Sequence, residues 1–144
     1  MSETAKIMKV LSGGKKVGTQ PDNGVELAFA LRAGLQFGMA TQLAKHTGIA
    51  LNRIFEAVNL SPRTMERRRL QKRMTTDESQ KITRFARIVA LGDEVFADST
   101  VTSQWLQRAN RALNGIAPID LLDTDAGARE VEAVLLRLEH GVYS

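Results

Sequence analysis

The residues best suited to chemistry in this sequence are arginines that follow a serine–proline pair. Ser61-Pro62 precedes Arg63, Thr64 and Arg67, and more cations continue to position 73. Arginine can donate two hydrogen bonds to the O6 and N7 atoms of guanine, and its charge displaces counterions from phosphates. The cluster therefore predicts contact with a nucleic acid.

We expect two kinds of contact from this cluster. Base edges are expected to meet Arg63, Thr64 and Arg67. Phosphates are expected to meet Arg53, Ser61, Arg68, Arg69, Lys72 and Arg73. The alternative is a solvated basic helix whose arginines pair with Glu66, Asp77 and Glu78.

A helix-turn-helix is the element that would position these side chains. Residues 51–58 have helical spacing, Asn59 tolerates the left-handed conformation of a turn, and Ser61-Pro62 supplies an N-cap and a first helical residue. The inner side of this motif is expected to carry Ile54, Val58, Leu60 and Met65. A rival register places the turn at Gly48 and Ile49, but it leaves the cations outside the groove-facing helix.

The rest of the chain predicts an all-α fold. Apolar residues recur at three- and four-residue spacing, and sustained strand patterns are absent from the sequence. The glycine-rich residues 1–23 are interpreted as a flexible basic tail, residues 24–92 as a helical DNA-binding domain, and residues 93–144 as a small helical unit. Thr76 is expected to cap one helix, and Thr124 to cap the last one.

Composition excludes several classes of function. There are no cysteines, so disulfides, thiolate metal sites and cysteine nucleophiles are excluded. His46 and His140 lack a second ligand at metal-binding spacing, and the carboxylates at 120, 123 and 125 fit a helix start. We expect neither an enzyme nor a bound cofactor or metal.

Charge is distributed unevenly along the chain. Residues 45–92 hold eleven basic and four acidic side chains, whereas residues 93–144 hold four basic and nine acidic ones. The longest apolar stretches fall short of the ~20 residues that span a bilayer, and no signal peptide is evident. We expect a cytoplasmic protein with two surfaces for two different partners.

The acidic C-terminal unit carries a row of large apolar residues, although a unit of about fifty residues can form only a small core. The members of this row are Trp105, Leu106, Leu121, Leu122, Val131, Leu135, Leu138 and Tyr143. Such a unit either packs on the helix-turn-helix part or buries this face on a partner. Tyr143 is the member expected to face outward.

A longer set of residues resembles a known family. The set comprises Thr64, Arg67-Arg68, Glu78-Ser79, Trp105-Leu106, Asn110, Ala112-Leu113, Gly115, Pro118, Leu121-Leu122, Thr124, Gly127, Val131, Leu135 and Gly141-Val142-Tyr143-Ser144. Across residues 34–144 this pattern is similar to the Xre-type antitoxins of bacterial RES/Xre toxin–antitoxin pairs.

The resemblance implies an antitoxin that represses its own operon through the helix-turn-helix and occludes the active site of a RES-type, NAD-depleting toxin. It implies that residues 93–144 form the toxin-binding domain and that the segment nearest the toxin's pocket is 131–144. The toxin-binding residues expected there are Leu135, Leu138, Glu139, Gly141, Val142, Tyr143 and Ser144. We expect a homodimer on operator DNA and a hetero-oligomer with toxin, because one recognition helix reads few base pairs.

Two alternatives remain open at this point. One is a stand-alone dimeric helix-turn-helix repressor whose C-terminal unit only dimerises. The other is an adaptor without a DNA role.

Overall fold

The computed structural model describes residues 1–14 and 20–141, and within these ranges the fold is all-α, as predicted. The helices are α1 (Glu3–Ser12), α2 (Gly24–Ala33), α3 (Phe37–Thr47), α4 (Leu51–Ala57), α5 (Pro62–Gln71), α6 (Thr76–Phe96), α7 (Ser99–Gln107) and α8 (Asp125–Glu139), with 3-10 turns η1 (Arg111–Leu113) and η2 (Pro118–Leu121). In the described ranges, no helix combines the length and apolarity needed to cross a bilayer.

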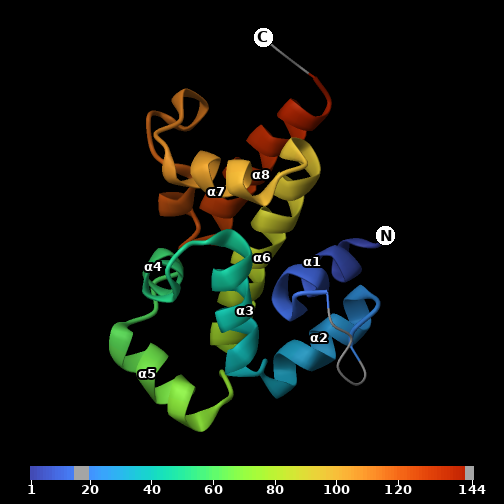
Figure 1. Ribbon diagram of the computed structural model, residues 1–144, viewed down its shortest axis with the longest axis vertical. Coiled ribbons are helices and arrows are strands. Elements are labelled where there is room, and N and C mark those ends of the chain that lie inside the picture. The colour runs from blue at the N-terminus through green and yellow to red at the C-terminus, as the bar shows by residue number, and fades with distance from the viewer. Residues whose placement is uncertain (15–19, 142–144) are drawn as a thin grey trace.

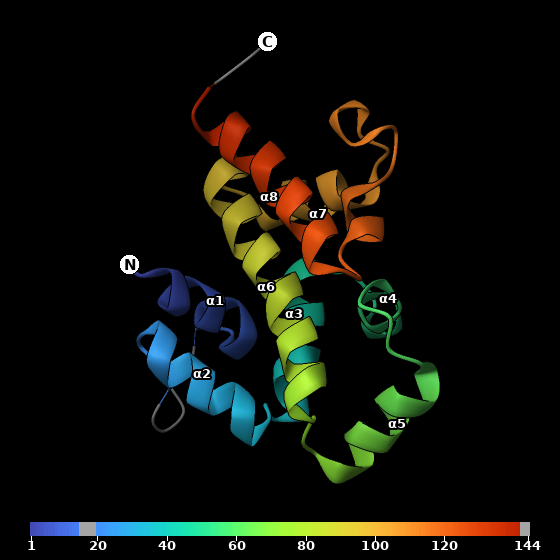
Figure 2. The same ribbon diagram turned by 180° about the vertical axis from the view of Figure 1, so that it is seen from behind.

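Helix α6 is the central element of the fold. It runs through the middle of the molecule, with α1 and α2 on one side and α4 and α5 on the other (Figures 1 and 2). Helices α7 and α8 pack near its C-terminal end. Its buried face includes Ile82, Phe85, Ile88 and Val89, each at most 1% exposed, as the helical spacing predicts. Both the basic and the acidic parts of the chain therefore rest on one helix.

The start of α6 differs by one residue from the prediction. The N-cap is Thr75, not Thr76: its side chain accepts a hydrogen bond from the backbone N–H of Glu78, and the Glu78 side chain accepts one from the backbone N–H of Thr75. This reciprocal capping box satisfies two donors that the helix itself leaves unpaired. Glu78 is thereby fixed at the first turn of α6.

The predicted basic tail over residues 1–23 is wrong for its first half. Ser2 caps α1, and Ile7, Met8 and Leu11 are at most 2% exposed where α1 packs on α3 and α6. These residues fall on one face of a helix, and burial of that face stabilises the segment in a way that its glycine-rich continuation conceals. Of that continuation, residues 15–19 lie outside the described ranges.

The two expected units share α6. The predicted boundary between residues 92 and 93 falls inside this helix, which continues to Phe96. The start of α8 is tied back to α6 because Arg84 pairs with Asp125 at 3.3 Å and donates to the carbonyl oxygen of Leu122 at 3.2 Å. The C-terminal unit therefore packs directly on the helix that supports α5.

Candidate nucleic-acid interface and C-terminal unit

The helix-turn-helix has the local geometry that the sequence predicts. α4 is followed by Asn59 at φ 61°, and the backbone N–H of Leu60 donates to the carbonyl oxygen of Phe55 at 2.8 Å. Ile54 and Val58 are fully buried, and Leu60 is 9% exposed. This apolar inner side holds α4 against the core and directs the chain outward into α5.

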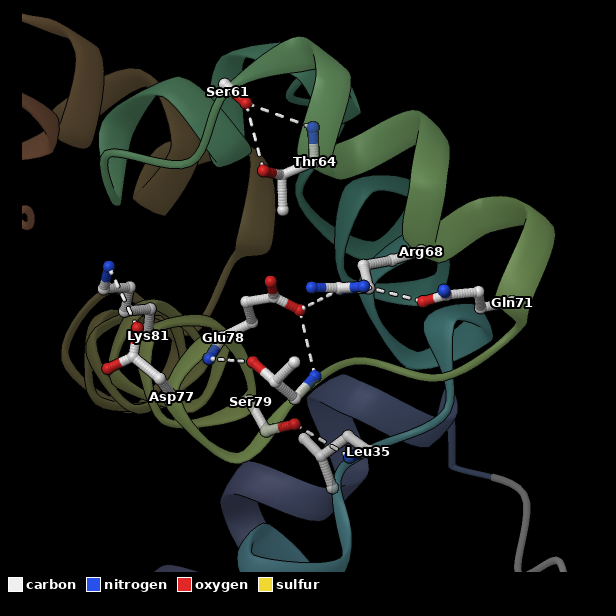
Figure 3. A network of polar contacts seen from close by, with 10 residues as sticks. Leu35, Ser61, Thr64, Arg68, Gln71, Asp77, Glu78, Ser79 and Lys81 are labelled. Carbon is white, nitrogen blue, oxygen red and sulfur yellow. Dashed lines mark hydrogen bonds and ion pairs between the residues drawn. The ribbon is translucent and has the colours of Figure 1, made fainter.

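The first turn of α5 is built by two hydroxyl groups. The Ser61 oxygen accepts from the backbone N–H of Thr64 at 3.1 Å, and its own proton is donated to the Thr64 hydroxyl at 3.0 Å (Figure 3). Pro62 occupies the first helical position, where its missing N–H does no harm. In this arrangement the Thr64 hydroxyl keeps its proton to donate outside the protein.

Helix α5 buries none of its residues, so polar contacts hold much of it in place. The main contact is an ion pair in which Nε of Arg68 lies 2.7 Å from Oε1 of Glu78 on α6 (Figure 3). A second nitrogen of Arg68 donates to the side chain of Gln71 at 2.6 Å. The side chains of the pair are only 15% and 9% exposed, so the pair acts where water screens it weakly.

Both members of this pair are held in their charged forms. Burial opposes ionisation of Glu78, but hydrogen bonds from Arg68 and Thr75, together with the charge of Arg68, outweigh it and lower the pKa of Glu78. The hydrogen bond to Glu78 raises the pKa of Arg68 against the effect of burial, and the carboxylate charge adds to the rise. Arg68, which the sequence predicts to contact a phosphate, is therefore engaged within the protein, where it ties α5 to α6.

The C-terminal end of α5 is tied to the start of α3. The backbone N–H of Phe37 donates to the carbonyl oxygen of Lys72 at 3.0 Å, and that of Met74 donates to Leu35 at 2.9 Å. Arg73 donates to the carbonyl oxygen of Gly34 at 2.6 Å. A Cβ on Gly34, which has φ +87°, would lie 2.2 Å from the carbonyl oxygen of Met74. Glycine at this position permits the close approach of the two segments.

Several predicted phosphate contacts are engaged within the protein. Arg53 pairs with Glu56 at 3.0 Å and with Asp120 of η2 at 2.6 Å. Arg69 pairs with Glu66 at 3.3 Å and lies 5.4 Å from the centre of the Phe37 ring. The alternative interpretation, in which acidic residues pair with the arginines, thus holds for Arg68 and Arg69, whereas Asp77 pairs with Lys81.

Three predicted cations keep their charge available. Arg63, Arg67 and Lys72 are exposed and have no ion pair or side-chain hydrogen bond to any described residue. Arg63 and Arg67 are four residues apart and so lie on one face of α5. The rival register is disfavoured because its second helix, α4, buries Ile54 and Phe55, whereas α5 buries none of its residues.

The C-terminal unit has its own apolar packing. Leu106, Ile119, Leu122 and Val131 are at most 2% exposed. Trp105 is half-buried, with its ring centre 5.8 Å from that of Phe96. Most of the predicted apolar row is therefore core.

The predicted toxin-contact residues divide between core and surface. Leu135 is fully buried, so its predicted contact role is wrong: it faces inward from α8 and stabilises the unit. Leu138 is 36% exposed, and Glu139 and Gly141 are exposed beside it. Val142, Tyr143 and Ser144 lie outside the described residues.

The fold and these surfaces define a class: helix-turn-helix proteins with an appended helical unit. Residues 26–87 match the antitoxin Xre-like helix-turn-helix domain, and residues 91–141 match the antitoxin Xre/MbcA/ParS C-terminal toxin-binding domain. The chain belongs to the Xre antitoxin family. This is a family of antitoxins with DNA-binding domains and not of enzymes.

Curated relatives support the same assignment. The chain is 30% identical over 132 residues to antitoxin Xre of Photorhabdus laumondii and 29% identical over 132 residues to antitoxin Xre of Yersinia enterocolitica, in each case covering 90% of this chain and 89% of the relative. It is 28% identical over 101 residues to the Prs ADP-ribosylating antitoxin of a Sphingobium species, covering 63% of this chain and 64% of the relative.

Proposed function

We propose that this antitoxin occludes the active site of a RES-type toxin that depletes NAD, and that it represses its own operon. The DNA role rests mainly on α5, a capped helix that buries no residue and presents Arg63 and Arg67, unpaired among the described residues, on one face. An exposed basic helix directly after a buried helix and a tight turn is the arrangement that enters the major groove in helix-turn-helix proteins. A protein with these two partners acts in the cytoplasm, where operator DNA and NAD are found.

Within α5 we assign base contacts to Arg63, Thr64 and Arg67 and a phosphate contact to Lys72. Ser61 acts as the N-cap of the helix, and any phosphate contact from it would be made by its backbone N–H. Replacing Arg63 and Arg67 together by alanine should weaken operator binding by about 1–3 kcal/mol for each arginine removed from a base edge. The same double substitution should also relax the preference for the operator sequence. The control replaces Arg129 and Arg137 together by alanine, which also removes two exposed cations but from α8, and it should bind operator normally.

We also propose that the protein acts on DNA as a homodimer. Two recognition helices read half-sites about one helical turn apart, so the operator should contain two related half-sites separated by roughly 34 Å. Light scattering coupled to size exclusion measures the mass of the free chain and of the operator complex. One protomer on one half-site would contradict this proposal.

Toxin neutralisation is tested by co-expression with the product of the neighbouring gene, with growth and cellular NAD as the readouts. Removing residues 140–144 truncates the chain after α8, leaving the buried Val131, Val134 and Leu135 in place. Rescue by the intact chain only would support occlusion by the C-terminal end. Rescue by both forms would show that neutralisation depends on another surface, and no toxicity at all would favour the stand-alone repressor.

The same cells distinguish two possible activities of the toxin, degradation of NAD and ADP-ribosylation of protein. A toxin that only degrades NAD should lower cellular NAD without attaching ADP-ribose to a protein. Because one relative carries the name of an ADP-ribosylating antitoxin, blots for ADP-ribosylated protein form the second arm of this experiment. If ADP-ribosylated protein is found and the intact chain rescues growth, the antitoxin function stands, but the toxin's activity is ADP-ribosylation of protein and not simple depletion of NAD.

A further inference from the structure

A cleft lies between the N-terminal helix and the C-terminal unit. Its volume is about 250 Å³, and its walls come from α1, α6 and α8. Ile7 and Lys6 contribute from α1, Leu91 from α6, and Leu136 from α8. The cleft thus joins α1, which lies outside both family matches, to the matched toxin-binding domain.

The cations lining the cleft are already neutralised. Lys6 pairs with Glu94, and Arg87 pairs with Glu3 at 3.3 Å. Their positive charges are therefore balanced by carboxylates from the cleft itself. Any net charge of the cleft must come from its remaining lining residues.

Those remaining charges are two carboxylates on α8. Glu132 and Glu139 form no ion pair or side-chain hydrogen bond with any described residue. They lie four residues before and three residues after Leu136, so all three side chains share one face of the helix. Leu136 is 36% exposed. The α8 wall of the cleft is an apolar side chain flanked by two free negative charges.

We propose that this cleft is part of the toxin-binding surface and receives a toxin segment that presents a lysine or arginine beside an apolar side chain. The proposal rests on the proposed function. An apolar centre with a charged rim is typical of protein interfaces, and opposite charge on the partner accelerates and orients association. Because α8 belongs to the matched toxin-binding domain, the cleft extends that surface from the C-terminal end down to α1.

The test measures the affinity of the full chain for the purified product of the neighbouring gene, at low and at high salt. Glu132→Lys and Glu139→Lys should each weaken binding about tenfold at low salt, with a smaller effect at high salt. Leu136→Asn should also weaken binding about tenfold, and this effect should persist at high salt because the substitution removes an apolar side chain from the interface without changing its charge.

Matched controls separate these effects from general ones. Glu130→Lys makes the same charge change on α8. Glu130 lies two residues before Glu132 and therefore on the opposite side of the helix. Val101→Asn makes the same apolar-to-polar change as Leu136→Asn at a position of similar exposure, 40%, on α7. Both controls should bind within twofold of the wild-type chain. Operator binding and thermal unfolding of every variant establish that the fold is intact.

The outcomes distinguish failure of the cleft proposal from failure of the proposed function. If the wild-type chain binds and the three cleft variants bind equally well, the cleft proposal is overturned while the antitoxin function stands. If the wild-type chain itself neither binds nor neutralises, the proposed function fails and the cleft proposal with it. Normal toxin affinity with altered self-association of the cleft variants would overturn the proposal in favour of a second copy of this chain.

Discussion

The ion pair between Arg68 and Glu78 gives the sharpest test of how this protein holds its exposed helix. Glu78→Gln is the chosen change because glutamine has nearly the same size and still serves at this position of a capping box. The substitution removes the negative charge while Arg68, 15% exposed at its side chain, keeps its positive one. The variant therefore isolates the charge of the pair.

The expected loss lies between two known limits. Removing one partner of a fully buried pair costs about 3–5 kcal/mol, and exposed pairs contribute about 0–1 kcal/mol. Because the guanidinium retains some access to water and glutamine still offers a neutral acceptor, we expect a loss of about 1–2 kcal/mol at pH 7. For a chain of this length that loss lowers Tm by roughly 3–8 °C.

The dependence on pH follows from the lowered pKa of Glu78. A carboxyl group with a lowered pKa in the folded state stabilises the fold fully above its unfolded pKa, and this contribution is lost as pH falls through the folded value. The stability difference between wild type and Glu78→Gln should therefore be complete at pH 7. It should shrink steadily below about pH 4.

Urea unfolding at pH 7 and at about pH 3 measures this difference, and fluorescence anisotropy with operator DNA measures its effect on binding. Glu66→Gln is the control because Glu66 also pairs with an arginine of α5 but is 60% exposed, so its loss should cost less than about 0.5 kcal/mol. Operator affinity should fall in Glu78→Gln and not in the control. A variant as stable as wild type at pH 7, or a difference that persists unchanged at low pH, would refute the reasoning.

Three further substitutions test the fold by urea unfolding. Leu11→Ala should cost about 2–4 kcal/mol because Leu11 is fully buried, and no loss would mean that α1 is not packed as described. Gly34→Ala should cost about 2–4 kcal/mol because its Cβ would meet the carbonyl oxygen of Met74. Gly38→Ala is the control: its Cβ would enter open space, so the substitution should be neutral or stabilise the fold by up to ~1 kcal/mol. Equal effects of the two substitutions would contradict the close approach at Gly34. Ser61→Ala should cost about 1 kcal/mol by removing the N-cap of α5, and an unchanged midpoint would show that the cap contributes nothing.

Local features of the fold were predictable because their causes lie within a few residues of each other. The turn at Asn59, the cap at Ser61 with Pro62 at the first helical position, and the cap at Thr124 all occur where the sequence indicates. Each depends on a side chain that bonds to nearby backbone or on a fixed φ angle. No distant contact is needed to define them.

The N-terminal helix shows a signal that sequence reasoning missed. Ser2 is a suitable N-cap, and Thr4, Ile7, Met8 and Leu11 have the spacing of one helical face. The glycines and lysines that follow favour a tail instead. Burial against α3 and α6, which no local pattern reveals, is what makes this short helix part of the core.

An all-helical chain with a capped, arginine-rich helix after a tight turn can be predicted from the amino-acid sequence, because spacing and capping act between near neighbours. Which arginines are available depends on tertiary packing, because Glu78 and Asp120, which are distant in sequence, pair with Arg68 and Arg53. Tertiary packing likewise decides that Leu135 faces the core while Leu136 and Leu138 remain partly exposed. Those outcomes depend on how α8 and α5 are rotated against α6, and that rotation is set by packing between segments distant in sequence.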